Sequence, residues 1–342
     1  MARQRHYAEA ARLLQGVAEP APLPQRIAFH RLKAAIASGL GDAAEAADEI
    51  ESALAAAPAD ESLKAAAAVA ELSAGRLDKA LAHARQLTTS AAAEALTGDI
   101  QEKRGDYVEA ANAYEKAVAL APDREEYRIH LALELIQHYT FEPAVTVLEQ
   151  AAPLFPRSAR IRMLLGVAEY AVRRPEEATA ALTDAVQIDP SLDPAWKYLA
   201  IVALDSGAPP RRTADALCRW NQVICGAVEL RIAREQNDAA LRAQAIRKLH
   251  QAPAGDAIAR CALGRDYESS GDWPDARREM EACVGLDPSP QNHYRLGLIY
   301  SALQLPDLAR AQMKLREQAA AKMADENTRR GEAVQAFQYV LK

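Results

Sequence analysis

A pattern of turns and stops that returns about every 34 residues constrains this chain more than any other feature. Its clearest copy spans 91–124 and has the sequence AAAEALTGDIQEKRGDYVEAANAYEKAVALAPDR. Gly105 can adopt the left-handed conformation that ends a helix, and it divides the unit into two runs of helical periodicity. Pro122 cannot continue the second helix and stops it. The unit therefore predicts two helices joined by a tight turn.

The second helix of this unit has an apolar stripe made largely of small residues. Tyr107, Ala110, Tyr114 and Ala117 fall at i, i+3, i+7 and i+10, which is one face of an α-helix. Alanine also carries much of the 50% hydrophobic content of the chain, while aromatic residues make up only 5%. Alanine-rich helices with few aromatics suit closely stacked helix pairs better than a single thick core.

The same punctuation recurs along the chain, with two exceptions at the turn. Gly41, Gly75 and Gly271 stand where Gly105 stands in the reference unit, but Tyr139 and Arg173 replace glycine in two successive units. A bulky residue at this position must either accept the cost of a positive φ or use another turn. We therefore expect helix pairs there too, with the geometry of those two junctions left open.

The pattern divides the chain into five segments within a single repeat array. These are a partial repeat, regular repeats, an irregular repeat or hinge, further regular repeats and a C-terminal capping helix, at 1–26, 27–207, 208–256, 257–323 and 324–342. Pro209-Pro210 lengthens a turn in the irregular segment, which is either drift in an array whose units vary or a hinge or insertion that faces a partner. The opening helix lacks a first helix before it, so we expect a cut from a longer protein or an amino-terminal cap. Val334, Phe337 and Leu341 are expected to cap the last repeat.

These residues resemble the tetratricopeptide repeat (TPR) family, and the resemblance covers nearly the whole chain except 208–256. The resemblance implies an all-α fold, a right-handed α-solenoid of stacked antiparallel helix pairs. It also implies a non-catalytic scaffold that binds a peptide or helix of a partner protein in its concave groove. The first helix of each repeat lines that groove in the family, at the second, fifth, ninth and twelfth positions.

The last three of these positions are mostly apolar in the central repeats. They hold Ile129, Leu133, Ile136, Met163, Val167, Tyr170, Lys197, Ile201 and Leu204. If exposed, such a strip suits an amphipathic helix or an extended apolar peptide. The alternative is that these side chains pack against adjacent helices. The family's clamp for a chaperone carboxyl terminus is not matched, because its asparagine position holds Leu96, His130, Leu164 and Tyr198.

Composition and motifs exclude several other classes of function. The net charge of −6 gives no electrostatic footprint for nucleic acid, and no apolar run approaches the ~18 residues of a membrane span. Phosphate-loop, zinc-protease and nucleophile-elbow motifs do not occur, so we predict no enzyme activity and no cofactor. His130 and His138 could face the same way, but they have no third ligand, so we predict no metal site.

The cysteines and the amino terminus bear on the compartment. Cys218, Cys225, Cys261 and Cys283 form no CxxC pair and no zinc-ligand spacing, so we interpret them as small buried hydrophobic residues in a reducing cytosol. The start of the chain lacks a signal-peptide core, which makes a cytoplasmic location the default. A second hypothesis is that the chain is the repeat portion of a larger enzyme, such as a glycosyltransferase or kinase. The sequence does not identify the partner or the oligomeric state.

Overall fold

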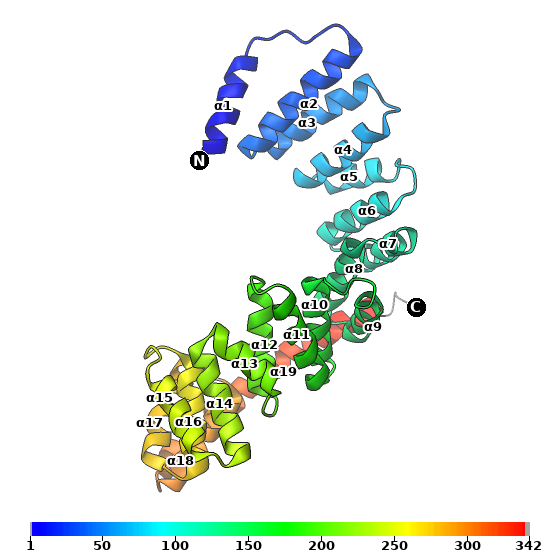
Figure 1. The fold of residues 1–342 in the computed structure, drawn as a ribbon. Helices are drawn as coiled ribbons and strands as arrows, with labels where there is room; N and C mark the ends of the chain where they lie inside the picture. The colour runs from blue at the N-terminus through cyan, green and yellow to red at the C-terminus, as the bar shows by residue number, and fades with distance from the viewer. Residues whose placement is uncertain (1, 339–342) are drawn as a thin grey trace. The chain divides into compact units, whose positions relative to one another are not determined.

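Helices account for all the regular secondary structure that is described. The computed structural model describes the backbone of residues 2–338 and the side chains of residues 6–326 and 328, and these residues form helices α1 to α19 and no strand (Figure 1). The prediction of an all-α fold is confirmed. The chain divides into two compact units between His138 and Tyr139, and each is described here by itself.

The first unit contains one single helix followed by helix pairs. Its helices are α1 (Ala2–Leu14), α2 (Leu23–Leu40), α3 (Ala43–Ala56), α4 (Glu61–Ser73), α5 (Leu77–Ala84), α6 (Ala91–Arg104), α7 (Tyr107–Leu120) and α8 (Glu125–Gln137). Within the pairs, α2 packs on α3, α4 on α5 and α6 on α7, and each pair also contacts the next along the chain. Tyr7 of α1 lies against Gly39 of α2, so the opening helix covers the first pair.

The second unit continues the alternation of helices. Its helices are α9 (Phe141–Ala151), α10 (Ala159–Ala171), α11 (Pro175–Ile188), α12 (Asp193–Asp205), α13 (Arg211–Trp220), α14 (Gln222–Gln236), α15 (Ala239–His250), α16 (Ala257–Ser270), α17 (Trp273–Leu286), α18 (Pro290–Ala302) and most of α19 (Pro306–Gln338). Here α10 packs on α11, α14 on α15 and α16 on α17. The cores of these pairs are built from alanine, leucine and valine at the inward positions of each stripe.

Left-handed residues end the first helix of most pairs, as the glycine spacing predicts. The residues with positive φ at these turns are Gly41, Gly75, Gly105, Tyr139, Arg173, Asn237, Gly271 and Gln304. Tyr139 and Arg173 thus accept a positive φ, of 58° and 65°, rather than using another turn. The backbone requirement of the repeat therefore overrides the steric preference of the side chain at these two junctions.

Replacing Arg173 by glycine is expected to stabilise the protein. A left-handed conformation costs a residue with a Cβ atom roughly 1–2 kcal/mol, and part of that gain is offset because glycine is more flexible in the unfolded chain. The Arg173 side chain is exposed, so little packing is lost. We expect Arg173→Gly to raise the free energy of unfolding by about 1 kcal/mol in urea denaturation. Arg173→Ala keeps the Cβ atom and should not raise the free energy of unfolding. Equal stability of the two variants would contradict backbone strain at position 173.

The irregularity expected between 208 and 256 is concentrated in the turn between α12 and α13. Ser206 follows α12 with an extended backbone, and Pro209-Pro210 then leads into the short helix α13. By contrast, α14 and α15 pack as a pair, and the left-handed residue Asn237 ends α14. The repeat register is thus restored from α14 onward, with asparagine in the place of glycine.

The last helix runs on through the charged stretch that follows the last repeat. Residues 306–338 form one continuous helix, α19, without a boundary at 324. Its first turns pack on α18, where Met313 lies against Gly297. Between 314 and 326 every side chain except Ala319 is exposed, as expected for a solvated charged stretch. Val334, Phe337 and Leu341 lie outside the described side chains, so their capping role stays a prediction.

The interpretation of the cysteines as unpaired hydrophobic residues is wrong. Cys218 bonds to Cys225 and Cys261 bonds to Cys283, so the part of the chain that the structure describes contains no free thiol. The sequence separations of 7 and 22 residues match no motif, because each pair is brought together by the packing of successive helices. Disulfides persist in oxidising compartments, so this pairing does not favour the reducing cytosol that we assumed.

None of the described helices is both long enough and apolar enough to cross a lipid bilayer.

Candidate functional site

The predicted groove residues of the first unit lie on α8, in and beside an acidic hollow. Ile129 is only 2% exposed and belongs to the core, while Leu133 and Ile136 are half-buried. Leu133 lines a cavity whose other walls include the acidic side chains of Asp99, Glu102 and Glu134. This part of the predicted apolar strip therefore borders carboxylates rather than further apolar groups.

Burial determines the electrostatics of this acidic hollow. It raises the pKa of Glu134 to about 7, and the nearby Glu102 carboxylate adds to the rise. Burial also lowers the pKa of His138, whose Nε2 lies 3.4 Å from the Glu134 carboxylate. Tyr114 donates a hydrogen bond of 2.8 Å to Asp99. The pKa of Tyr114 is raised mainly by burial, and this hydrogen bond adds to the rise. Some of these groups pair within the hollow, although Glu134 Oε1 has no hydrogen-bond partner, and we do not assign a ligand to the hollow.

The predicted groove residues of the second unit divide between packing and exposure. Met163, Tyr170 and Leu204 are partly buried against the core between α11 and α14. Val167 is half-buried, whereas Lys197 and Ile201 are exposed, Ile201 by 51%. Burial raises the pKa of Tyr170 to about 12, helped by the hydrogen bond that its hydroxyl donates to Asp205. Of this set, Leu204 alone also lines the cavity described next.

A cationic cavity of about 200 Å³ lies among α12, α14, α16 and α18 of the second unit. Four arginines line it: Arg231 and Arg234 from α14, Arg265 from α16 and Arg295 from α18. The remaining walls are apolar or acidic, formed by Leu204, Ala227, Leu230, Ala257, Ile258, Cys261, Ala262, Asp266 and Asp287. Guanidinium groups from three helices therefore converge on one small space.

Three of the four arginines have no carboxylate partner among the described residues. Arg231 donates one hydrogen bond to the backbone carbonyl of Leu204, and its buried Nε has no partner. Arg265 donates from Nε to the Cys261 carbonyl at 3.0 Å, and Arg234 makes no ion pair with a described residue. Arg295 differs, because its Nη1 lies 2.7 Å from Glu268. Three of the four guanidinium groups therefore lack a close ion pair among the described residues, although Glu235, Asp205 and Asp287 are near enough to offset part of the charge.

The two carboxylates of the cavity wall are engaged elsewhere. Asp266 is 2.6 Å from Arg242 of α15, and Asp287 accepts a 2.8 Å hydrogen bond from Asn292 of α18. Burial lowers the pKa of the Arg265 guanidinium, and repulsion from Arg295 and Arg231 lowers it further. Burial likewise lowers the pKa of Arg231, with Arg234 adding to the effect. An anion bound here would relieve this repulsion, because opposite charge favours the charged form of each arginine.

Three of the four arginines occupy groove positions that the repeat register identifies. Counted so that the left-handed residue is the fifteenth of its repeat, Arg231 and Arg265 are ninth and Arg234 is twelfth, whereas Arg295 is sixth, one residue after a groove position. The count from the regular repeats ends at Leu204, because Pro209-Pro210 breaks the register and Asn237 stands where the turn residue is usually glycine. The signal was therefore present in the sequence but hidden behind the irregular turn.

Comparison with protein families agrees with this register. Tetratricopeptide repeat models match residues 96–124, 131–193 and 261–323. The chain contains tetratricopeptide repeats. The matches contain most of the reference unit and of α16 to α18, including Arg265 and Arg295. Proteins built from such repeats act as scaffolds for protein interaction, and they bind protein partners. Comparison with curated proteins found no match.

Several solved structures of TPR proteins are similar to this chain. The C-terminal part of a TPR repeat-containing protein from Cytophaga hutchinsonii is 16% identical, with a TM-score of 0.51 over 75% of this chain and 94% of that one. A tetratricopeptide repeat protein from Parabacteroides merdae is 14% identical, with a TM-score of 0.45 over 82% and 98%. YrrB, described as a TPR protein with an unusual peptide-binding site, is 17% identical, with a TM-score of 0.41 over 55% and 95%. The first of these supports the α-solenoid fold.

Proposed function

We propose that this TPR protein is a non-catalytic scaffold that binds an acidic segment of a partner protein on the groove-facing side of α14, α16 and α18. The observation that supports it is the cavity in which Arg231, Arg234 and Arg265 meet without a carboxylate partner among the described residues. Charge-assisted hydrogen bonds from guanidinium to carboxylate are among the strongest that proteins form. A glutamate or aspartate side chain of an extended segment is small enough for such a cavity.

The apolar wall of the cavity adds a second recognition element. Leu204, Leu230 and Ile258 border the arginines, and Ile258 is 38% exposed. A segment with an acidic residue beside an apolar one would therefore satisfy both kinds of surface. Lys197 and Ile201 are exposed on α12, which also contributes Leu204 to the cavity. These two predicted groove residues therefore extend the proposed surface.

Loss of the cavity charge is expected to weaken binding of an acidic peptide about tenfold or more, since removing one partner of a charge pair commonly costs ~2 kcal/mol. The measurement is fluorescence anisotropy with a labelled peptide rich in Glu and Leu, titrated with wild type and with Arg231→Met/Arg265→Met. A control peptide with Gln in place of Glu should bind wild type no more tightly than the Glu peptide binds the variant.

The matched control removes the same net charge from outside the cavity. Arg211 and Arg247 are both exposed, and neither lines the cavity. Arg211→Met/Arg247→Met should leave the affinity within about twofold of wild type at physiological salt, because exposed charges are screened over a Debye length. If this control weakens binding as much as the cavity variant does, attraction is by net charge alone and the proposed site is wrong.

A further inference from the structure

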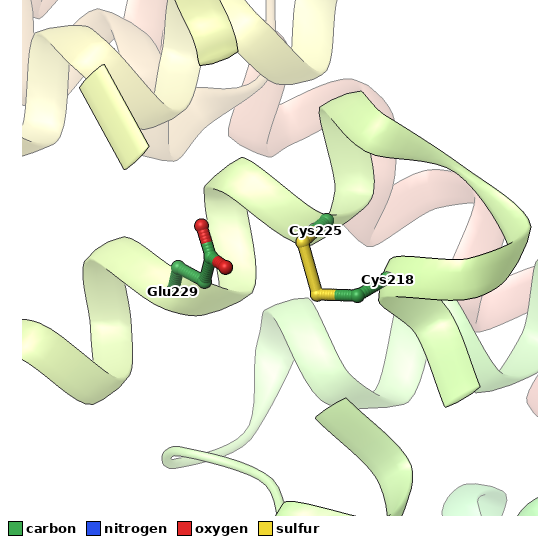
Figure 2. Close-up of side chains that lie close together, drawn as sticks. All are labelled: Cys218, Cys225 and Glu229. Atoms are coloured by element: carbon green, nitrogen blue, oxygen red, sulfur yellow. A yellow bond between two sulfur atoms is a disulfide. The ribbon is translucent and has the colours of Figure 1, made fainter. Parts of the chain in front are cut away.

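A disulfide fixes the corner at which α13 meets α14. Cys218 lies in the last turn of α13 and Cys225 in the first turn of α14, and the bond joins them across Asn221 (Figure 2). The two sulfur atoms differ in access, because Cys218 is half-buried whereas Cys225 is fully buried. A thiol from solution can therefore approach the bond only from the Cys218 side.

A lysine from a third helix contacts the buried sulfur. Lys248 of α15 places its Nζ 3.2 Å from Cys225 Sγ. The same ammonium donates to both oxygens of Glu229, at 2.7 and 2.8 Å. Glu229 lies one turn after Cys225 on α14, and its carboxylate is within 4.8 Å of both sulfurs (Figure 2). The cation is thus in direct contact with Cys225, while the carboxylate opposes part of its effect.

The second disulfide of the chain has neither a half-buried cysteine nor an ammonium group in contact with a sulfur. Cys261 and Cys283 are 4% and 0% exposed, between α16 and α17. The polar group that contacts a sulfur there is the neutral amide of Asn292, 3.8 Å from Cys261. The protein therefore contains an internal reference, a disulfide that is buried on both sides and has no ammonium beside it.

We propose that Cys218–Cys225 is a thiol-exchange site that accepts electrons from a dithiol, whereas Cys261–Cys283 is a structural bond. This inference does not depend on the proposed binding of an acidic segment. In thiol–disulfide exchange the rate rises when the leaving sulfur is stabilised as a thiolate and when the attacked sulfur is accessible. Cys225 meets the first condition through Lys248, and Cys218 meets the second.

The exchange balances without any further reactant. One thiolate of the dithiol attacks Cys218 Sγ, a mixed disulfide forms, and the electron pair of the broken bond goes to Cys225 Sγ, next to the Lys248 ammonium. The second thiol of the donor, deprotonated by solvent base, then attacks the donor sulfur of the mixed disulfide and releases Cys218. The donor ends as a disulfide, and the protein gains two electrons and, at neutral pH, up to two protons.

A bound metal explains the cluster less well. Cys218, Cys225 and Glu229 supply three potential ligand atoms, but the sulfurs are bonded to each other and the carboxylate is neutralised by Lys248. A structural zinc site needs four ligands without a competing cation. The ammonium next to Cys225 therefore favours electron transfer chemistry at sulfur over metal binding.

The test measures the reduction of both disulfides in the full chain. Folded protein is treated with dithiothreitol, samples are quenched with an alkylating reagent, and peptide mass spectrometry follows each cysteine over time. We expect Cys218 and Cys225 to become labelled at least about tenfold faster than Cys261 and Cys283. Equal rates for the two bonds would overturn the proposal.

Two substitutions at the cluster should act in opposite directions. Lys248→Met should slow reduction of Cys218–Cys225 about threefold to tenfold, because the thiolate loses its cation, and Glu229→Gln should speed it. Arg247→Met removes an exposed charge from the neighbouring position on α15 and should leave the rate unchanged. A similar change in all three variants would show that the cluster does not control the reaction.

Wild-type protein gives a test that needs no substitution. Glutathione, a monothiol, can form the mixed disulfide but has no second thiol to resolve it. Mass spectrometry of the trapped adduct is expected to place glutathione on Cys218. An adduct found mainly on Cys225 would contradict the proposed direction of attack.

Discussion

Glu169→Gln is expected to stabilise the protein about 2–3 kcal/mol more near pH 8 than near pH 5. Glu169 of α10 is 6% exposed, and its Oε2 has no hydrogen-bond partner. Burial raises its pKa to about 7, and the carboxylates of Glu177 and Glu149 contribute to the rise. A glutamine has nearly the same shape as the neutral acid and cannot ionise, so it avoids the cost of a buried charge.

The direction of this pH dependence follows from the pH range in which Glu169 holds its proton in the folded and the unfolded state. The folded protein holds this proton up to about pH 7, whereas the unfolded chain loses it near 4.5. The stability that neutral Glu169 contributes is therefore fully present below about pH 4.5 and is lost as the pH rises through about 7. Urea denaturation of both proteins across this window measures the difference. Glu176→Gln, at an exposed position, is the control, and an equal effect of this control would contradict a buried origin.

Gly166→Ala is expected to destabilise the protein by about 2 kcal/mol, because the added methyl group overpacks the contact between α10 and α11. A Cβ atom on Gly166 would lie 2.6 Å from Leu182 Cγ and 2.9 Å from the backbone oxygen of Ala178. The second contact is with backbone, so it cannot be relieved by a rotamer change. The helices must move apart, and the buried interface between them loses contacts.

The same substitution at a free position should have the opposite sign. Gly285 lies near the end of α17, and nothing lies within 4 Å of a Cβ atom added there. Gly285→Ala should therefore stabilise the protein by about 0.5 kcal/mol, since alanine has the higher helix propensity. Thermal or urea denaturation of both variants decides the matter. Comparable stability of Gly166→Ala and Gly285→Ala would refute the close packing of α10 on α11.

Local rules in the sequence were enough to predict the helix pairs. Glycine at the turn, proline after the second helix and small residues on the stripe each act within one repeat, so they can be recognised without the rest of the structure. The same rules left the junctions at Tyr139 and Arg173 open, because both residues adopt a conformation that their side chains disfavour. Packing of the whole repeat determines the backbone there.

The candidate sites could be predicted only in part, because they depend on neighbours that are distant in sequence. The register places Arg231, Arg234 and Arg265 on the groove side, but it does not show that they lack carboxylate partners. The disulfides were missed for a similar reason: Cys261 and Cys283 are 22 residues apart and meet because α16 packs on α17. Charge balance and sulfur pairing are properties of the stacked array, not of one repeat.

Selection of short random peptides on the immobilised full chain tests the proposed acidic-segment site most directly. We expect peptides rich in Asp and Glu, with an adjacent apolar residue, to be enriched on wild type and lost on Arg231→Met/Arg265→Met. Enrichment of apolar peptides that persists on this variant and disappears on Met163→Glu/Val167→Glu would contradict the account. In that case the apolar side chains of α10, rather than the arginines of α14 and α16, would form the binding surface.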